Sequence, residues 1–353
     1  MSAMPLSAMQ LLNQDESKNK DVRVEHVEAC FLCGKRGVTL YTGLRDRLFS
    51  APGVWRLLRC EQCALIWLTP RPTSSELGRL YKTYYTHSAS DASWRRLARD
   101  AALLTRTGSN AKISGCGWKV AGRLLCIVPF IREAATVSTV HLSRTLGGLL
   151  VDVGCGSGEF LNVMRQAGWQ VLGVDLDARA ADVAREQFGI EARVGPLERA
   201  GLAEGSVDVL TMRHVIEHLP NPEEALHVCL QTLKTGGRLI VLTPNAESLG
   251  HRFFRQNYIS LDPPRHLYLF SLKTLRAMVE RAGFRVEMLR TSTRLAGATW
   301  VSSSEIRRTG KRQSLGATAW AMLKGIPFSA AEKVAHVFLP GVGEEIVLIA
   351  RKS

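Results

Sequence analysis

The sequence predicts an α/β fold in which a doubly wound, mostly parallel sheet carries helices on both faces, with a small N-terminal module and a helical insertion. Apolar strand-like runs alternate with helix-like runs after residue 149, and such alternation favours a parallel sheet. The first of these strands runs into a glycine-rich turn at 154–158. Two Cys-x-x-Cys pairs stand far upstream, at 30–33 and 60–63.

The expected strands and helices follow in order along the chain. Strands are predicted at 149–153, 170–174, 190–194, 207–212, 237–243, 284–290 and 344–350, and helices at 159–167, 178–188, 222–233 and 271–282. Asn221 is expected to cap the third helix, with Pro222 at its first position. The chain is divided into a disordered N-terminus (1–24), a cysteine module or zinc ribbon (25–75), a basic helical linker or lid (76–148) and an α/β domain (149–353) with an insertion at 291–341.

The glycine turn indicates a nucleoside site. Gly154, Gly156 and Gly158 alternate after the strand, and because glycine lacks a Cβ, a flat ligand can lie against the turn. A dinucleotide fingerprint would need a third glycine where this chain has Glu159, which favours a nucleoside without a pyrophosphate. The next strand delivers Asp175, whose carboxylate can accept both ribose hydroxyls.

At this point the residues resemble the class I S-adenosylmethionine-dependent methyltransferases, whose pattern is a VDVGCGSG-like loop followed by GVD. The similarity covers roughly 149–290 and continues through His214–Leu219, Leu233–Leu239 and Thr243–Asn245. It implies a Rossmann-like sheet of seven strands, the last antiparallel, and S-adenosyl-L-methionine as methyl donor. The implied donor-binding residues are Asp152, Gly154, Cys155, Gly156 and Gly158 around the methionine, Asp175 on the ribose, Leu176 on the adenine, the backbone at Gly195 and Leu197, and Arg213 with His214.

The cysteine pairs predict a structural Zn²⁺ site. Each pair lets two thiolates from one tight turn reach a single ion, and two pairs complete a tetrahedron. The ligands would be Cys30, Cys33, Cys60 and Cys63, with strand-like runs at 38–41 and 54–58 between the pairs. The segment 64–72 resembles the exit of N-terminal zinc modules in bacterial methyltransferases, except that Ala64 departs from their pattern. A redox role is disfavoured because no thioredoxin-like βαβ pattern surrounds either pair. Packing roles are expected for Cys116, Cys126, Cys155 and Cys229.

Three histidines are candidates for catalysis, because a hydroxyl acceptor needs a base to take its proton. His266 is favoured, since Asp262–Ser271 resembles the family's PRHlyfF segment over the acceptor pocket; His218 is next, followed by His214. Each could instead be a structural, hydrogen-bonded histidine. His214-x-x-Glu217-His218 also matches a zinc-protease string, and approximates the E-x-x-E-H string with which some methyltransferases bind a divalent metal. The string follows a strand rather than lying within a helix, which disfavours a protease. His214 stands where the methyltransferase string has its first glutamate, so we interpret Glu217 as a structural partner.

Charge is unevenly distributed. The net charge is +14, of which 95–148 carries +7 and 291–353 carries +5, whereas 149–290 carries −1. Basic residues mixed with apolar ones at 94–99, 120–131, 317–327 and 333–339 suit an anionic acceptor or an acidic lipid surface, or are only solvated faces.

The first 20 residues are polar and no apolar run could span a bilayer. We therefore expect a cytoplasmic protein, with peripheral contact to the inner face of the membrane left open.

A zinc module on a basic chain also raises a rival function, nucleic-acid binding or RNA modification. Enzymes that methylate base amino groups resemble one another in an N/D-P-P-Y/F/W motif after strand four, where this chain has Thr211–His214. Nor is there a basic stripe interleaved with aromatics.

The favoured function is O-methylation, with C- or N-methylation open, of a sugar, a glycolipid or polysaccharide precursor, or another small metabolite. The oligomeric state is left open.

Overall fold

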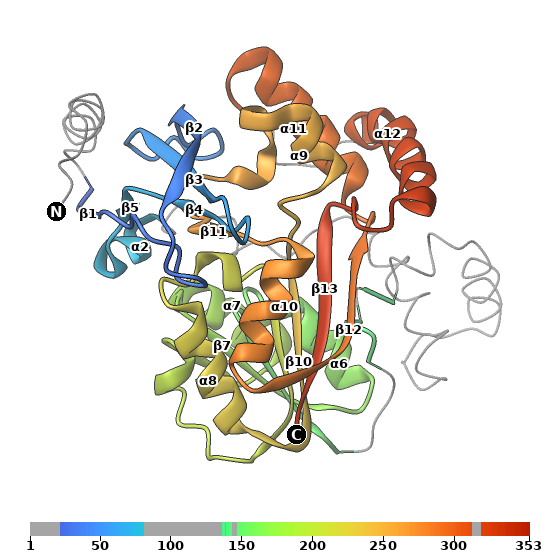
Figure 1. Ribbon diagram of the computed structural model, residues 1–353. Coiled ribbons are helices and arrows are strands. Elements are labelled where there is room, and N and C mark those ends of the chain that lie inside the picture. The colour runs from blue at the N-terminus through green and yellow to red at the C-terminus, as the bar shows by residue number, and fades with distance from the viewer. Residues whose placement is uncertain (1–21, 81–135, 138, 143–146, 313–318) are drawn as a thin grey trace, which may run out of the picture.

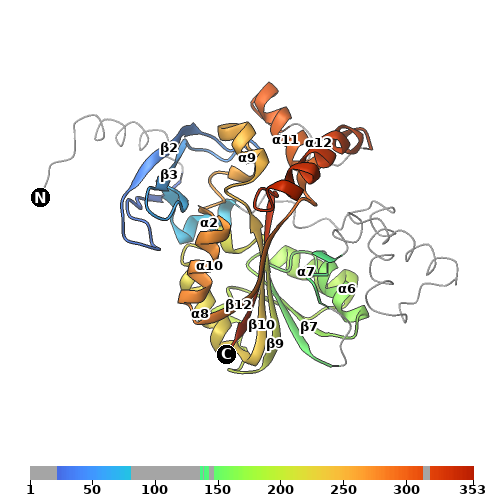
Figure 2. The same cartoon turned by 45° about the vertical axis from the view of Figure 1, so that its right-hand side comes forward.

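The computed structural model describes residues 22–80, 136–137, 139–142, 147–312 and 319–353 (Figure 1). The N-terminus up to residue 21 and most of the expected basic linker, with Cys116 and Cys126, lie outside these residues. A large mixed sheet carries α6 and α7 on one face and α8 and α10 on the other (Figure 2). A smaller sheet and the helices α9, α11 and α12 lie beyond one end of it.

The large sheet has seven strands in the order β12–β13–β10–β9–β6–β7–β8. Their bounds are β6 Leu149–Val153, β7 Gln170–Asp175, β8 Ala192–Val194, β9 Val207–Arg213, β10 Leu233–Pro244, β12 Phe284–Ser292 and β13 Glu345–Lys352. The pairs from β10 to β8 are parallel, whereas β13 is antiparallel to both of its neighbours. This confirms the predicted seven-stranded fold with an antiparallel last strand.

The helices that cover the sheet begin close to the predicted positions. They are α6 Glu159–Gln166, α7 Ala178–Phe188, α8 Pro222–Thr232 and α10 Leu272–Arg281. Asp177 caps α7 and Ser271 caps α10 through their side chains, satisfying N–H groups that have no partner within the helix. The expected cap at Asn221 is wrong in one respect: its side chain accepts no backbone hydrogen bond and instead donates to Glu224.

The N-terminal sheet is formed by two distant parts of the chain. Its strands β2 (Gly37–Leu44), β3 (Trp55–Cys60) and β4 (Ile66–Leu68) come from the cysteine module, and β11 (Tyr268–Leu269) adds a fourth strand beside β4. A second, two-stranded sheet pairs β1 (Val24–Glu25) with β5 (Arg71–Pro72), and α2 (Ser74–Leu80) follows. The cysteine module therefore pairs, strand to strand, with a segment of the α/β domain.

The segment before the last strand forms a helical pair. Helix α11 (Ala296–Thr309) packs on α12 (Ala319–Phe338) so closely that a Cβ added to Gly297 would lie 2.8 Å from the Gly325 carbonyl oxygen. Trp300 stacks on Phe328 between them. The remaining elements are α9 Leu249–Phe254 and the short 3₁₀ turns η2 Leu197–Arg199, η3 Ile216–His218, η4 Arg255–Asn257 and η5 Ile259–Leu261. Among the described residues, no helix combines the length and the apolar character needed to cross a membrane.

Candidate functional site

The glycine turn lies at the carboxyl end of β6, at the centre of the sheet. Gly154, Gly156 and Gly158 have φ values of 71°, 53° and 78°, which residues with side chains rarely adopt. A Cβ on Gly154 would collide with the Val215 side chain, and one on Gly158 would lie 2.8 Å from Ala184. Conformation and close approach both require glycine here, because α7 and the loop after β9 lie directly against the turn.

Asp175, at the end of β7, is fixed against this turn. Its Oδ2 accepts the Gly156 N–H at 2.8 Å, and its Oδ1 accepts the Asp177 N–H at 2.9 Å. The next residue, Leu176, is 62% exposed. A held carboxylate beside an exposed apolar side chain suits a ribose and a base. At the neighbouring strand end, Gly195 has a φ of 133° with open space where a Cβ would be. The Leu197 side chain is buried in the core, which leaves its backbone for any ligand contact.

Asp152 and Arg213 lie beneath the turn. Asp152 is fully buried and accepts from the Thr211 hydroxyl at 2.5 Å and from Arg213 at 3.4 Å. Burial raises the pKa of Asp152 despite the Arg213 charge, while the Arg213 guanidinium stacks on the Phe160 ring. Cys155 is also buried, and its Sγ would lie 2.6 Å from a Cβ at Gly173. Cys155 therefore packs against β7, as expected for a packing residue.

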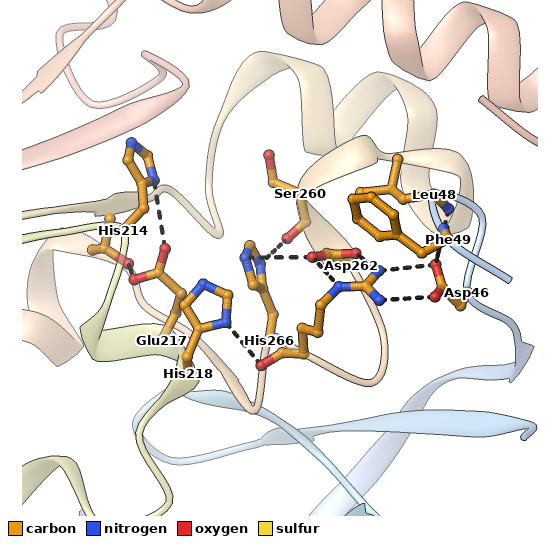
Figure 3. Close-up of polar contacts among 11 residues, drawn as sticks. Asp46, Leu48, Phe49, His214, Glu217, His218, Ser260, Asp262 and His266 are labelled. Carbon is orange, nitrogen blue, oxygen red and sulfur yellow. Dashed lines mark hydrogen bonds and ion pairs between the residues drawn. The ribbon is translucent and has the colours of Figure 1, made fainter. Parts of the chain in front are cut away.

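His214, directly after β9, is held between two carboxylates. Its Nε2 lies 2.7 Å from Glu345. Its Nδ1 lies 3.4 Å from Glu217 (Figure 3). Burial alone would lower the pKa of His214, but the two carboxylates outweigh it and raise the pKa to about 9. The imidazole is therefore protonated at neutral pH, which argues against His214 as a general base.

His218 and His266 face each other at the same edge, with ring centroids 4.6 Å apart. His218 donates its Nδ1–H to the Arg265 carbonyl at 3.0 Å, and His266 donates its Nδ1–H to the Ser260 carbonyl at 2.7 Å (Figure 3). Both donations make Nε2 the basic nitrogen. Burial and the neighbouring His266 lower the pKa of His218 to about 4, and burial lowers that of His266. Both rings are therefore neutral at pH 7.

Glu217 completes this cluster. Its side chain is buried. Its Oε2 accepts from the Thr243 hydroxyl at 2.9 Å, and its Oε1 lies 3.4 Å from Nδ1 of His214. Burial alone would raise the pKa of Glu217, but the contact with the protonated His214 outweighs it and lowers the pKa to about 2. The ligand atoms of Glu217, His218 and His266 all lie within 4.8 Å of one another, close enough to hold a metal ion. The cluster could thus accept a proton from a hydroxyl or coordinate a divalent cation.

A buried ion cluster that the sequence did not reveal lies beside His266. Arg265 is fully buried and donates to both oxygens of Asp46 at 2.8 Å and to Asp262, while Phe49 stacks on its guanidinium (Figure 3). Burial alone would raise the pKa of Asp46, but Arg265 outweighs it and lowers the pKa. Residues 262–265 form a turn, in which the Arg265 N–H donates to the Asp262 carbonyl. This turn presents the Arg265 charge to Asp46 of the cysteine module. The carbonyl of the same Arg265 fixes His218.

The four cysteines form one cluster. Sγ atoms lie 3.4 Å apart for Cys30 and Cys63, 3.3 Å for Cys33 and Cys60, and 3.8 Å for Cys33 and Cys63. A tetrahedral zinc site has Zn–S bonds of about 2.3 Å and therefore S–S edges of about 3.8 Å. All four sulfur atoms lie within 4.8 Å of one another, close enough to be ligands of one tetrahedral ion.

The two cysteine turns have the same backbone conformation. Gly34 has a φ of 69° and Ala64 a φ of 66°, and each N–H donates to the carbonyl four residues earlier. A left-handed conformation costs a non-glycine residue about 1–2 kcal/mol. Ala64→Gly should therefore stabilise the protein by about 0.5–1 kcal/mol, after allowing for glycine's larger unfolded-state entropy. The reverse change in the other turn, Gly34→Ala, meets no neighbour within 4 Å but should destabilise the protein through its backbone. Urea denaturation that ranked the two variants the other way would contradict this.

Comparison with known proteins agrees with the geometry. Residues 133–289 match the family model described as a methyltransferase domain. The chain is 34% identical over 113 residues to a ubiquinone biosynthesis O-methyltransferase of Azoarcus sp. (strain BH72), covering 30% of this chain and 48% of the relative. Over 145 residues it is 30% identical to a probable S-adenosylmethionine-dependent methyltransferase of Mycolicibacterium smegmatis, covering 41% and 54%. The chain spans about half the length of the curated relatives it matches.

Among solved structures, an S-adenosylmethionine-dependent methyltransferase from Mesorhizobium loti is similar at 17% identity. The TM-score is 0.44, and the match covers 62% of this chain and 97% of the other.

Proposed function

We propose that this methyltransferase-domain protein transfers the methyl group of S-adenosyl-L-methionine to a hydroxyl of a small-molecule acceptor. The observation that carries the proposal is Asp175, held by two backbone N–H groups beside the exposed Leu176 and the glycine turn. The match to a methyltransferase domain over 133–289 supports it. When bound, the donor supplies a methyl group already activated on a sulfonium, so the chain must position the acceptor and exclude water.

The donor's adenosine would lie along the carboxyl ends of β6, β7 and β8. Each carboxylate oxygen of Asp175 can accept more than one hydrogen bond, so the ribose hydroxyls can bind without breaking the bonds to the turn. Leu176 would pack on the adenine, and the backbone at Gly195 and Leu197 would meet its edge. Asp152 and Arg213 would support the turn from below, because Asp152 is buried.

Asp175→Ala should raise the dissociation constant for the donor by at least about tenfold, since a hydrogen bond to a charged group contributes roughly 1.5–3 kcal/mol. Calorimetric titration with S-adenosylhomocysteine measures this directly. Asp182→Ala removes an exposed carboxylate of α7 that pairs with Arg185 on the same helix, and should leave the constant near that of the unchanged protein. Equal constants for both variants would refute the placement of the ribose.

For the transfer itself we assign His266 as the general base, with His218 as the second candidate. His266 is neutral at pH 7, and its Nδ1–H is committed to the Ser260 carbonyl, so Nε2 is the atom that would take the acceptor's proton. His218, 4.6 Å away between ring centroids, would help to hold the acceptor. A hydroxyl acceptor suits this pair of neutral imidazoles, and the O-methyltransferase names of the relatives point the same way.

His266→Gln should lower turnover at least about a hundredfold, because a positioned general base contributes roughly 10²–10⁴-fold. Donor affinity should stay near normal. Turnover would be measured with radiolabelled donor and an acceptor found by screening sugars, nucleotide sugars and glycolipids; product analysis then separates O- from C- and N-methylation. His227→Gln, at an exposed histidine of α8, serves as the matched control. Undiminished turnover in the His266 variant would remove it from the mechanism.

We also propose that Cys30, Cys33, Cys60 and Cys63 hold a structural Zn²⁺. The spacing of their sulfur atoms supports this, as do the two turns of matching conformation. Such an ion would fix the positions of β2, β3 and β4. Nucleic acid that co-purifies at moderate salt would instead favour the rival function of the zinc module.

A further inference from the structure

A cavity outside the donor and histidine sites lies between the N-terminal four-stranded sheet and helix α9. Its volume is about 390 Å³, within the range of small-ligand sites. Arg59 of β3 lines one side, and Arg252 and Arg255 of the α9 region line the other. Figure 2 shows β2 and β3 beside α9.

The cavity is strongly basic. Three guanidinium groups line it against the single carboxylate of Glu247. In the part of the chain that the structure describes, none of the three arginines forms an ion pair, although Arg252 donates through Nε to the Glu247 carbonyl. Guanidinium groups without carboxylate partners that converge on one cavity suit an anion, and arginine binds phosphate oxygens in pairs.

The lining also contains an uncharged polar pair, Tyr41 and His251. His251 donates its Nδ1–H to the Ala246 carbonyl at 2.6 Å, so its Nε2 accepts from the Tyr41 hydroxyl at 3.2 Å. Burial lowers the pKa of His251 and raises that of Tyr41, against the opposing effect of Arg255 and Arg59 on Tyr41. Neither group adds a negative charge that would repel an anion.

Arg255 is held in an unusual backbone conformation. Its φ of 50° and ψ of −122° lie in a sparsely populated region for a residue with a side chain, at a cost of about 1–3 kcal/mol. Glycine would adopt this conformation more easily, yet the position carries an arginine that lines the cavity. The α9 end is fixed there because the Arg255 N–H donates to the His251 carbonyl.

The cavity is also near the histidine cluster. Ala246 in its wall follows Thr243 by three residues, and the Thr243 hydroxyl binds Glu217. Three residues of extended chain span at most about 11 Å. A ligand anchored in the cavity could therefore reach the histidines with its other end.

We propose that this cavity binds the phosphate or diphosphate group of the acceptor, and that Arg59, Arg252 and Arg255 recognise it. This inference rests on the proposed function, because it assigns the acceptor to the phosphate esters. A nucleotide-linked acceptor and a polyprenyl-linked one share the diphosphate. The cysteine module contributes directly, since Arg59 immediately precedes Cys60.

The test is calorimetric titration of the zinc-loaded, full-length protein with inorganic pyrophosphate. Saturable binding is expected, weakened at least about tenfold in Arg255→Ala and further in Arg252→Ala/Arg255→Ala. Arg255→Lys keeps the charge without the paired N–H groups and should be intermediate. Arg276→Ala, at an exposed arginine of α10 outside the cavity, is the matched control. Titrations with UDP and with farnesyl diphosphate then distinguish a nucleotide-linked acceptor from a polyprenyl-linked one. The ligand that binds more tightly identifies the group to which the acceptor is linked.

Absence of saturable pyrophosphate binding up to roughly 10 mM, or equal affinity in the double variant and the Arg276 control, would overturn the inference. S-adenosylhomocysteine is titrated into the same samples. If it binds while pyrophosphate does not, only the anion site fails; if it does not bind to the unchanged protein, the proposed function fails independently. Retained donor binding in each variant shows that the domain is folded.

Discussion

Replacing Cys60 with serine should abolish stoichiometric zinc binding and unfold much of the N-terminal module. A structural Zn²⁺ site contributes about 10–16 kcal/mol of apparent binding free energy at pH 7 in zinc-finger peptides, and this ion would join the two cysteine turns, whose four sulfur atoms lie within 4.8 Å of one another. Cys60 ends β3, and the second cysteine turn leads from it into β4, so the ion would constrain how these two strands are arranged. Metal analysis of the purified protein, with limited proteolysis of residues 24–72, measures both effects.

A cysteine outside the cluster provides the control for this experiment. Cys229 is fully buried in α8 with no role in the four-sulfur cluster. Cys229→Ala should therefore retain one zinc per chain, with only the modest destabilisation of a small core cavity. A Cys60→Ser protein with full zinc content and unchanged protease resistance would show that the cluster is not a metal site.

Arg265→Ala should destabilise the protein by about 3–5 kcal/mol, because it leaves the buried carboxylates of Asp46 and Asp262 without their cation. Urea denaturation measures the change, with Arg276→Ala on the surface of α10 expected within about 0.5 kcal/mol of the unchanged protein. Turnover should also fall, because the Arg265 backbone carbonyl positions His218. Asp46→Asn keeps the shape of the side chain and should give a smaller loss. A change below about 1 kcal/mol in Arg265→Ala would show that the carboxylates find other partners or protonate.

Much of the fold is predictable because its signals are local. The strand at 149–153, the three glycines and Asp175 lie within one strand–turn–helix–strand unit, and the seven strands follow from runs of neighbouring residues. The four cysteines are predictable for the same reason: each pair sits in one turn, and the sulfur atoms of the two pairs meet in the structure. The conformation of Ala64 matches that of Gly34 despite the departure from the pattern.

The parts that could not be predicted depend on pairs of residues far apart in the chain. Asp46 and Arg265 are separated by 219 positions, and neither stands in a pattern that indicates burial. His214 is a candidate base from its place after a strand, but the carboxylate that keeps it charged, Glu345, comes 131 residues later. Asn221 carries a cap signal, yet its amide donates to Glu224 instead. In each case the partner of the side chain, which the local sequence pattern does not specify, determines its role.

The pairing of β11 with β4 has a consequence for how this chain could be shortened or recombined. A truncation beginning near residue 76 would remove β4 and leave the backbone of Tyr268 and Leu269 without its pairing strand. It would also remove Asp46, the ion-pair partner of the buried Arg265 guanidinium. Residues 22–72 are thus not a detachable appendage. A fusion that exchanged them for another module would keep the α/β domain intact only if the incoming segment supplied both a strand to pair with β11 and an acid to pair with Arg265.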